Sequence, residues 1–347
     1  MNYEETLSRL CALSAPSGFE GPAVQAAAEL LRPLADEVYT TRLGSVVGVR
    51  RCGRENAQKL LLDAHLDEIG LIVTGHEEGF LRFAPLGGVD PRMLPDREVV
   101  LLTDPPIHGV VACLPPHVQT ADDMNNSLPI KDLYIDVGLS QEEAETRIPA
   151  GTPVTYRGGC APLGEELLCG KALDDRCGFA VLLDVLERLK DTPLDVDLYV
   201  LGSTQEETHS TGAITAAYEL APNLCVAVDV THGDSPDASK HETFKLGGGP
   251  VVGVGPNCAR SLSWRLKELA ELAEEEIPFQ IEVMSGSSGT NAWPIQVSRE
   301  GVATAVVSIP ERYMHTPVEV VHRKDLEDTA KLLAAFVESL GEGEETC

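Results

Sequence analysis

The chain has 347 residues, a length that suits two domains or one large domain carrying an insertion. Its 55 acidic residues outnumber its 27 lysines and arginines, and the resulting net charge of −28 disfavours nucleic acid as a partner. Hydrophobic residues form 43% of the chain and charged residues 24%, which is typical of a globular protein and excludes a disordered or collagen-like chain.

The cysteines and the N-terminal segment bear on localisation. The nine cysteines form no C-x-x-C pair, which disfavours a disulfide framework and a structural zinc knuckle and favours a reducing compartment. The first residues are acidic where a signal peptide would be basic, and no apolar run approaches the about 18 residues that a membrane span needs. We therefore predict a cytoplasmic protein with no membrane partner.

Hydrophobic periodicity predicts an α/β domain at both ends of the chain. Apolar residues recur at helical spacing over 4–12 and 21–34, and short apolar runs at 45–49 and 59–63 are typical of strands. Helices and strands alternate again after residue 162. The expected helices there are 177–190, 212–219, 261–276 and 324–340, and the expected strands are 196–203, 224–230, 278–285 and 303–310.

The segment between these two parts has a different composition. Glycine and proline separate short β-rich runs such as LIVTG, REVVLLT and PVTY, a pattern that indicates a small all-β module. We therefore predict that residues 1–69 and 163–347 form an α/β domain, into which residues 70–162 are inserted.

Polar side chains stand where strands of the α/β domain are expected to end, the place where ligands collect in such sheets. Three of them follow apolar strand-like runs, where an unpaired carboxylate would be costly, so a cation should compensate them. Two histidines, two aspartates and a glutamate suit a two-metal hydrolytic centre of zinc or cobalt, with one more carboxylate left as a base. These residues are His65, Asp174, Glu206, Glu207, Asp229 and His315.

Each of these residues taken alone has a plainer interpretation. A lone histidine is usually structural, the Asp-Asp-Arg at 174–176 is typical of a helix N-cap with a surface charge pair, and adjacent glutamates are usually solvated. Other catalytic motifs are missing: the sequence has no H-E-x-x-H, Walker A or G-x-S-x-G motif. Ser287 and Ser288 lack the strand-turn-helix context of a nucleophile, and His209 and His232 are interpreted as loop residues near the proposed ligands.

Several segments, in order along nearly the whole chain, resemble one family. They are AHLDEIG, GGVDPRMLP, LYIDVG, GKALDDR, DVTHGDSP, SGSSGTNA and the ending REGVATAVVSIPERYMHTPVEVV. The family is that of the prokaryotic cytosolic metallo-aminopeptidases, which includes glutamyl, deblocking and tetrahedral aminopeptidases of peptidase clan MH. The resemblance implies a zinc-peptidase-like α/β/α sandwich with a mixed central sheet, and an inserted β-barrel-like dimerisation domain.

The resemblance also implies roles for the site residues. His65, Asp174 and Asp229 would hold one divalent metal, and Asp174, Glu207 and His315 would hold the other. Asp174 would then bridge two ions per subunit, zinc, or else cobalt or manganese.

Two carboxylates have implied roles outside the ligand set. Glu206 would be the general base that takes a proton from the metal-bridging water, and Asp67 would orient the imidazole of His65. A free α-amino group would complete one metal's shell, so short peptides would lose their N-terminal residues. The resemblance further implies a homo-oligomer, built from dimers up to a tetrahedral dodecamer.

Two alternatives stay open at this point. The same ligands serve metal-dependent deacylases and carboxypeptidase-like amidohydrolases of the same clan, and a catalytically silent binding protein could keep the fold. The chain departs from the family pattern at residues 208–212 and at Asn291, where the family usually has an aspartate, followed by the bulky Trp293. Both departures concern the expected substrate pocket.

Overall fold

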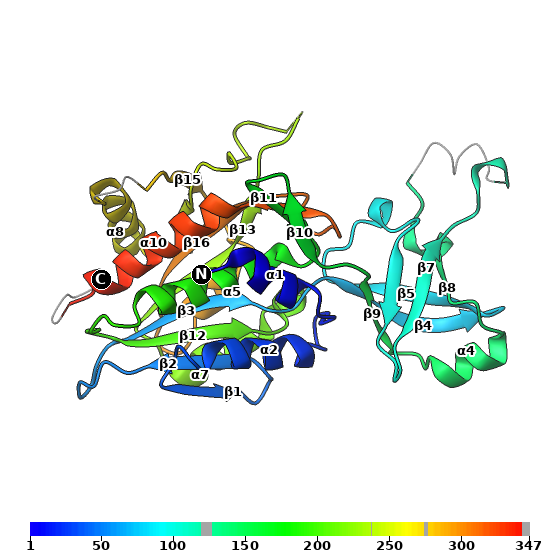
Figure 1. Ribbon diagram of the computed structural model, residues 1–347, viewed down its shortest axis with the longest axis horizontal. Helices are drawn as coiled ribbons and strands as arrows, with labels where there is room; N and C mark the ends of the chain where they lie inside the picture. Colours follow the sequence, from blue (N-terminus) through cyan, green and yellow to red (C-terminus); the bar gives the residue numbers. More distant parts are fainter. Residues whose placement is uncertain (119–126, 237, 274–276, 342–347) are drawn as a thin grey trace.

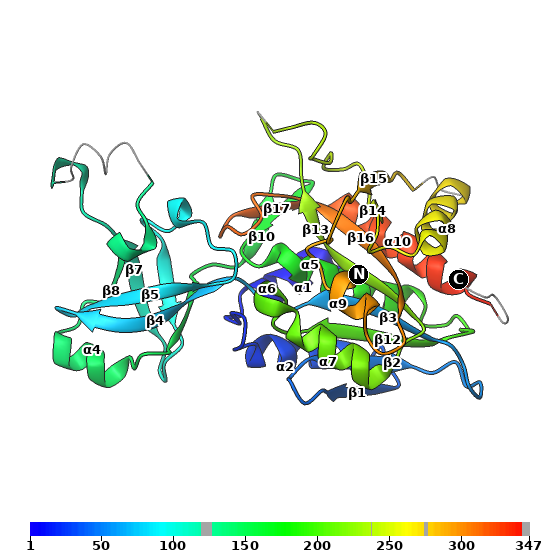
Figure 2. The same ribbon diagram turned by 180° about the vertical axis from the view of Figure 1, so that it is seen from behind.

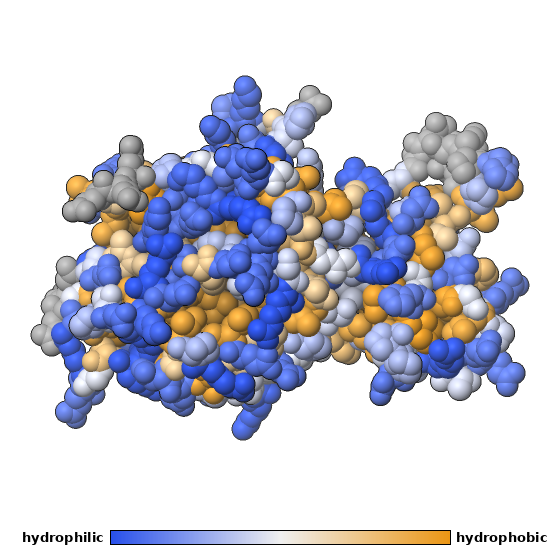
Figure 3. Space-filling view, in the orientation of Figure 1, coloured by the Kyte–Doolittle hydropathy of each residue, from blue (hydrophilic) through white to orange (hydrophobic). Residues whose placement is uncertain are grey.

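The computed structural model of the chain describes residues 1–118, 127–236, 238–273 and 277–341, and has two lobes joined by a narrow waist (Figures 1 and 3). Both termini lie in the larger lobe (Figure 1). Among the described residues, no helix combines the length and the apolar composition needed to cross a membrane.

An 11-stranded mixed sheet forms the centre of the larger lobe. Strands β12, β3, β13 and β16 are parallel neighbours, whereas β1, β2, β17, β11 and β10 pair antiparallel at the two sides, and β14 and β15 extend the sheet beside β16. In sheet order the main strands are β1 (Glu37–Thr40), β2 (Val46–Arg50), β12 (Asp197–Ser203), β3 (Lys59–His65), β13 (Leu224–His232), β16 (Ala303–Arg312), β17 (Glu319–His322), β11 (Leu167–Gly170) and β10 (Cys160–Leu163), with β14 (Val251–Val254) and β15 (Gln280–Val283) off this path.

Helices cover both faces of this sheet because alternate side chains of each strand point to opposite faces. Leu60 and Leu62 pack in the core under α1, α2, α5, α8 and α10, whereas Leu61 packs under α7 and α9. Figure 1 shows α1, α5 and α10 in front of the sheet, and Figure 2 shows α7 and α9 on the opposite side. The helices are α1 (Tyr3–Cys11), α2 (Gly21–Leu31), α5 (Leu173–Arg188), α6 (Glu206–His209), α7 (Thr211–Leu220), α8 (Arg260–Leu272), α9 (Ala292–Gln296) and α10 (Arg323–Ser339).

This arrangement confirms the predicted α/β/α sandwich with a mixed sheet. Most expected elements of the larger lobe are present near their predicted bounds. The helix expected at 261–276 is α8, and the end of the prediction, residues 274–276, lies outside the described residues. Four strands are too short for a clear alternation of apolar and polar residues in the sequence. They are β1, β10, β11 and β17.

The smaller lobe is a closed six-stranded barrel with its own apolar core. The sequence analysis predicts only strands here, but α4 (Gln141–Arg147) also forms, with a capping box between Ser140 and Glu143. In barrel order the strands are β4 (Gly70–Glu77), β5 (Phe80–Leu86), β8 (Tyr134–Asp136), β7 (Ile107–Ala112), β6 (Glu98–Leu101) and β9 (Pro153–Tyr156).

A buried ion cluster ties the start of the chain to the middle of the sheet. Glu68, which follows β3, accepts from the ammonium of Lys171 at 2.7 Å and from the guanidinium of Arg176 at 3.3 Å. Arg176 is fully buried and also donates to the backbone carbonyls of Leu10 and Leu13, each at 2.9 Å. The cluster therefore fixes the end of α1, the segment after β3 and the first turn of α5 against one another.

We predict that Arg176→Ala lowers the free energy of unfolding by about 3–5 kcal/mol, because it leaves a buried carboxylate half-paired and several carbonyls without a donor. Urea unfolding measures this change. Arg9→Ala, which removes an exposed arginine paired with Glu29, is the matched control and should cost about 0–1 kcal/mol. Equal losses for the two variants would contradict a structural role of the buried cluster.

Candidate metal centre

The residues named from the sequence meet at one edge of the central sheet. His65 ends β3, Asp229 lies near the end of β13, and Glu206 and Glu207 open α6, just after β12. These three parallel strands have their carboxyl ends at the same edge. Asp174 and His315 reach this edge from the first turn of α5 and from the turn between β16 and β17.

Asp174 lies between the two imidazoles. Its Oδ1 is 2.9 Å from Nε2 of His65, and its Oδ2 is 3.3 Å from Nε2 of His315. The same nitrogen of His315 lies 3.2 Å from Oε2 of Glu207. One carboxylate with an oxygen toward each of two histidines has the geometry of a bridging ligand.

The backbone holds the neighbouring carboxylates in place. The two oxygens of Asp67 accept hydrogen bonds from the amides of Glu206 and Glu207, each at 3.1 Å, and its Oδ1 lies 3.5 Å from Nδ1 of His65. Asp229 accepts from the amide of Val230 at 2.8 Å. Asp67 therefore links the strand that carries His65 to the helix that carries both glutamates.

The barrel lobe also reaches this site. Nδ1 of His315 lies 3.1 Å from the carbonyl oxygen of Gly88, a contact that leaves Nε2 of the ring directed at Asp174 and Glu207. A Cβ atom at position 88 would lie 2.6 Å from Nδ1 of His315, so the close approach requires glycine. Gly88 is not recognisable as a site residue in the sequence, because nothing in the local pattern shows which histidine it approaches.

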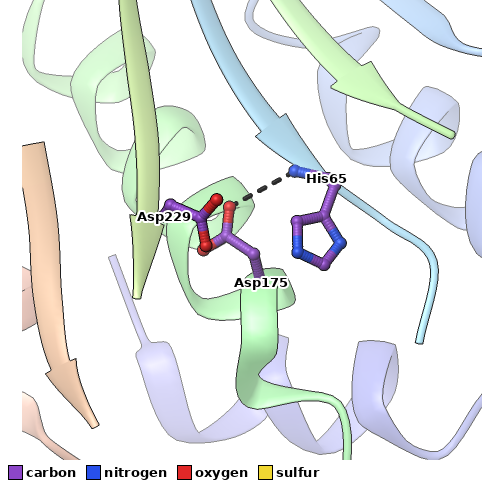
Figure 4. Close-up of side chains that lie close together, drawn as sticks. All are labelled: His65, Asp175 and Asp229. Atoms are coloured by element: carbon purple, nitrogen blue, oxygen red, sulfur yellow. Dashed lines mark hydrogen bonds between the residues drawn. The ribbon is translucent and has the colours of Figure 1, made fainter. Parts of the chain in front are cut away.

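A further carboxylate, Asp175, lies in the same cluster. The potential metal-binding groups of the described residues are His65 with Asp175 and Asp229, and His65 with Asp174 and Glu207. Figure 4 shows Asp175 and Asp229 side by side, with Asp175 bonded to the backbone amide of His65 at 3.2 Å. Asp175 and Arg176 are both fully buried, so the interpretation of 174–176 as a surface charge pair is wrong.

Burial and neighbouring negative charges raise the pKa of carboxyl groups in this cluster. Burial raises the pKa of Glu206 to about 9, and the charges of Asp229 and Glu207 add to this shift, although His65 opposes it. Burial likewise raises the pKa of Asp229 to about 8. Bound cations would favour the ionised carboxylates and reverse this pattern.

The pKa values of Asp174 and His315, which face each other, are shifted in opposite directions. Burial acts to raise the pKa of Asp174, but hydrogen bonds from His315 and His65 hold it below its usual range. Burial acts to lower the pKa of His315, but hydrogen bonds with Asp174 and Glu207 raise it to about 11. The two imidazoles thus lie where the carboxylates need a neighbouring positive charge. Bound metal ions would meet the same need.

These residues open into a cavity of about 750 Å³. Five residues of the cluster line this cavity: Asp174, Glu206, Glu207, Asp229 and His315. The other lining residues that bear on the sequence analysis are Thr208, His209, Ser210, His232, Ser287, Ser288 and Trp293. The altered segment after Glu207 and the serines therefore face the cavity. His209 ends α6 and His232 ends β13, so the interpretation of both as loop residues is wrong, and both line the cavity.

Asn291 does not line the cavity that Trp293 borders. It is buried, and its Nδ2 donates to Asp63 at 2.8 Å and to Ser203 at 2.9 Å. An amide suits this position because it donates to the Asp63 carboxylate, whereas a second carboxylate would repel it. Asparagine in place of the usual aspartate at position 291 thus provides a hydrogen-bond donor for the buried carboxylate of Asp63.

Comparison with known proteins now adds to this geometry. The family model described as "M42 glutamyl aminopeptidase" matches residues 44–332, most of the chain. The chain belongs to the M42 glutamyl aminopeptidase family. Members of this family are hydrolases of peptide bonds, so this chain is an enzyme of that class.

Individual relatives align with almost the whole length of this protein. It is 34% identical over 342 residues to a lysyl aminopeptidase from Pyrococcus furiosus, covering 97% of both proteins. It resembles the structure of an aminopeptidase from Desulfurococcus kamchatkensis with a TM-score of 0.89 and 37% identity, covering 97% of this chain and 95% of that one. It also resembles a TET peptidase from Pyrococcus horikoshii, with a TM-score of 0.85, 29% identity and coverage of 98% and 100%.

The contact between Gly88 and His315 generates a prediction for this M42 peptidase. Gly88→Ala should displace the imidazole and lower kcat/KM for an aminoacyl anilide by about ten-fold or more, because small misplacements of catalytic groups cost rate steeply. Gly75→Ala in the same lobe is the control, since a Cβ there meets nothing within 4 Å. If both variants kept the wild-type rate, the barrel contact would not position His315.

Proposed function

We propose that this protein is a dinuclear metallo-aminopeptidase that removes N-terminal residues from short peptides. The observation that carries the proposal is the placement of Asp174, whose two oxygens face Nε2 of His65 and Nε2 of His315. A buried carboxylate between two imidazoles, beside further carboxylates, suits two divalent cations rather than one.

The proposed ligands follow the two sides of Asp174. His65, Asp174 and Asp229 would hold one ion, and Asp174, Glu207 and His315 would hold the other. The imidazoles favour zinc, with cobalt and manganese as the alternatives. Asp174 is preferred to Asp175 because Asp174 lines the cavity, whereas the oxygens of Asp175 accept from the amides of His65 and Gly178.

Glu206 is the proposed general base. Its side chain lines the cavity and approaches Nε2 of His65 at 4.0 Å, so it stands beside the proposed ligands without being one of them. The bound cations would polarise the scissile carbonyl and lower the pKa of the attacking water. Glu206 would accept the proton of that water and pass it to the leaving amine. Asp67 would hold the amide of Glu206 and orient His65.

The free amino group of the substrate distinguishes this proposal from its alternatives. An aminopeptidase binds the α-amino group at the centre, whereas a deacylase or carboxypeptidase-like enzyme of the same clan accepts a blocked nitrogen. The names of the family and of its Pyrococcus furiosus relative, glutamyl and lysyl, both denote aminopeptidases but differ in the residue removed. These names support the aminopeptidase reaction, but they do not agree on the N-terminal side chain that is preferred.

We also propose that the protein is a homo-oligomer that assembles through the barrel lobe, the expected dimerisation domain at residues 70–162. The TET peptidase from Pyrococcus horikoshii assembles into a tetrahedron or a large octahedral shell. In this chain Val110, Leu114 and Val118 are exposed on the barrel lobe. Exposed apolar side chains on one lobe suit contact with a second copy.

Hydrolysis of paired substrates tests the proposed function. The panel consists of aminoacyl anilides and short peptides with free N-termini, each beside its N-acetylated form, with metal-stripped protein before and after zinc, cobalt or manganese is added. We expect the stripped protein to be inactive, because the proposed centre supplies the attacking water. We expect the added metal to restore cleavage of the free-amino substrates alone, because the free α-amino group would complete the shell of one ion.

The other outcomes decide between the alternatives. Cleavage of the N-acetylated substrates would overturn the aminopeptidase assignment in favour of a deacylase. No cleavage with any metal would overturn it in favour of a silent binding protein. Full activity after metal removal would exclude the proposed centre.

Replacement of the proposed base gives a separate prediction. Glu206→Gln should retain the bound metal by elemental analysis but lower kcat by about 10²–10⁴-fold, because the amide cannot accept the proton. Glu219→Gln, on the exposed end of α7, is the control and should keep the wild-type rate. A near-wild-type rate for Glu206→Gln would rule out its role as base.

A further inference from the structure

The cavity contains one carboxylate that the proposed metal centre does not use. Glu282 lies on β15, outside the set of proposed ligands, and lines the same cavity as Asp174 and Glu206. It is half-buried, and the side chain of Thr231 on β13 is close enough to act on the pKa of its carboxyl group. Figure 2 shows β14 and β15 beside β16, the strand next to β13 in the sheet.

Within the cavity, His232 is the basic side chain whose charge acts on Glu282, and Lys240 borders a second hollow that Glu282 also lines. The described lining residues include no lysine and no arginine. Burial raises the pKa of Glu282, while the Thr231 hydroxyl and the charge of His232 act in the opposite direction. Two divalent cations would offset Asp174, Glu206, Glu207 and Asp229, and would leave Glu282 as the remaining acid of the described lining.

The distance from the centre to Glu282 can be estimated along β13. Asp229 and Thr231 are two residues apart on this strand, so their side chains share a face and lie about 6.6 Å apart. Of these two residues, Thr231 is the one whose side chain acts on Glu282. A lysine carries its ammonium on a four-carbon stem that extends about 6 Å from its Cα atom. A substrate anchored beside Asp229 could therefore place a cationic side chain at Glu282.

We propose that Glu282 selects peptides whose N-terminal residue is lysine or arginine, by pairing with the cationic side chain. The inference rests on the proposed aminopeptidase function. The rest of the cavity wall fits the stem of such a side chain, because Met284 and Trp293 contribute apolar surface to the same cavity. A long aliphatic stem contacts these residues, and the charged end reaches the acid.

Substrate panels on two variants test this assignment. Wild-type protein loaded with zinc should cleave lysyl and arginyl anilides with higher kcat/KM than leucyl and glutamyl anilides. Glu282→Gln should lower kcat/KM for the lysyl substrate by about ten-fold or more while changing the leucyl substrate by less than about two-fold, because only the charge-assisted contact is lost. Glu282→Lys should shift the preference toward the glutamyl substrate.

A nearby acid provides the matched control. Glu242 is exposed and borders, together with Glu282, a second hollow of about 810 Å³, but it does not line the cavity of the proposed centre. Glu242→Gln removes the same charge close by, and should leave the lysyl to leucyl ratio unchanged. An equal change in both variants would overturn the direct contact and indicate a diffuse electrostatic effect.

The outcomes separate this inference from the proposed function. Wild-type cleavage of leucyl or glutamyl anilides in preference to lysyl and arginyl anilides would overturn the role of Glu282 and leave the aminopeptidase intact. Equal losses on all substrates in Glu282→Gln would likewise overturn it, as the residue would then support the fold or the centre. No cleavage of any free-amino substrate would contradict the proposed function itself.

Discussion

The repulsion between buried carboxylates is the constraint on which the rest of this structure depends. Asp174, Asp175, Asp229, Glu206 and Glu207 converge at one edge of the central sheet, where burial raises the pKa of several of them. Water screens charges poorly in such a place, so folding brings together groups that oppose one another's ionisation. Two imidazoles beside Asp174 relieve part of this repulsion, and the proposed cations would relieve the remainder.

The surrounding scaffold holds these groups with backbone amides and with a second buried charge cluster. Asp67 accepts from two amides of α6, and Glu68 next to it pairs with Lys171 and Arg176. Consecutive residues after β3 thus anchor α6, which carries Glu207, and the start of α5, which carries Asp174. The barrel lobe contributes the carbonyl of Gly88, which contacts His315. The site is therefore supported by both lobes, although most of its residues belong to the larger one.

The same strand geometry that builds the centre also builds the pocket beside it. Alternation along β13 places Asp229 toward the proposed metals and Thr231, on the same face, toward Glu282. The proposed selectivity residue, Glu282, lies on β15, which contributes no proposed ligand. Asn291 departs from the family pattern, yet it donates to Oδ2 of Asp63 in the interior and does not line the cavity.

The sequence by itself determined the α/β class, the inserted β-rich segment and the set of polar residues at strand ends, because these follow from local periodicity and from residues next to apolar runs. Tertiary structure alone decided which of these groups face one another. Gly88 and His315 are 227 residues apart, and Asp175 and Arg176 look like an exposed helix start until their burial is known. Glu282 lies in a short half-exposed strand without any motif. Long-range packing, which no local pattern encodes, brought it into the cavity.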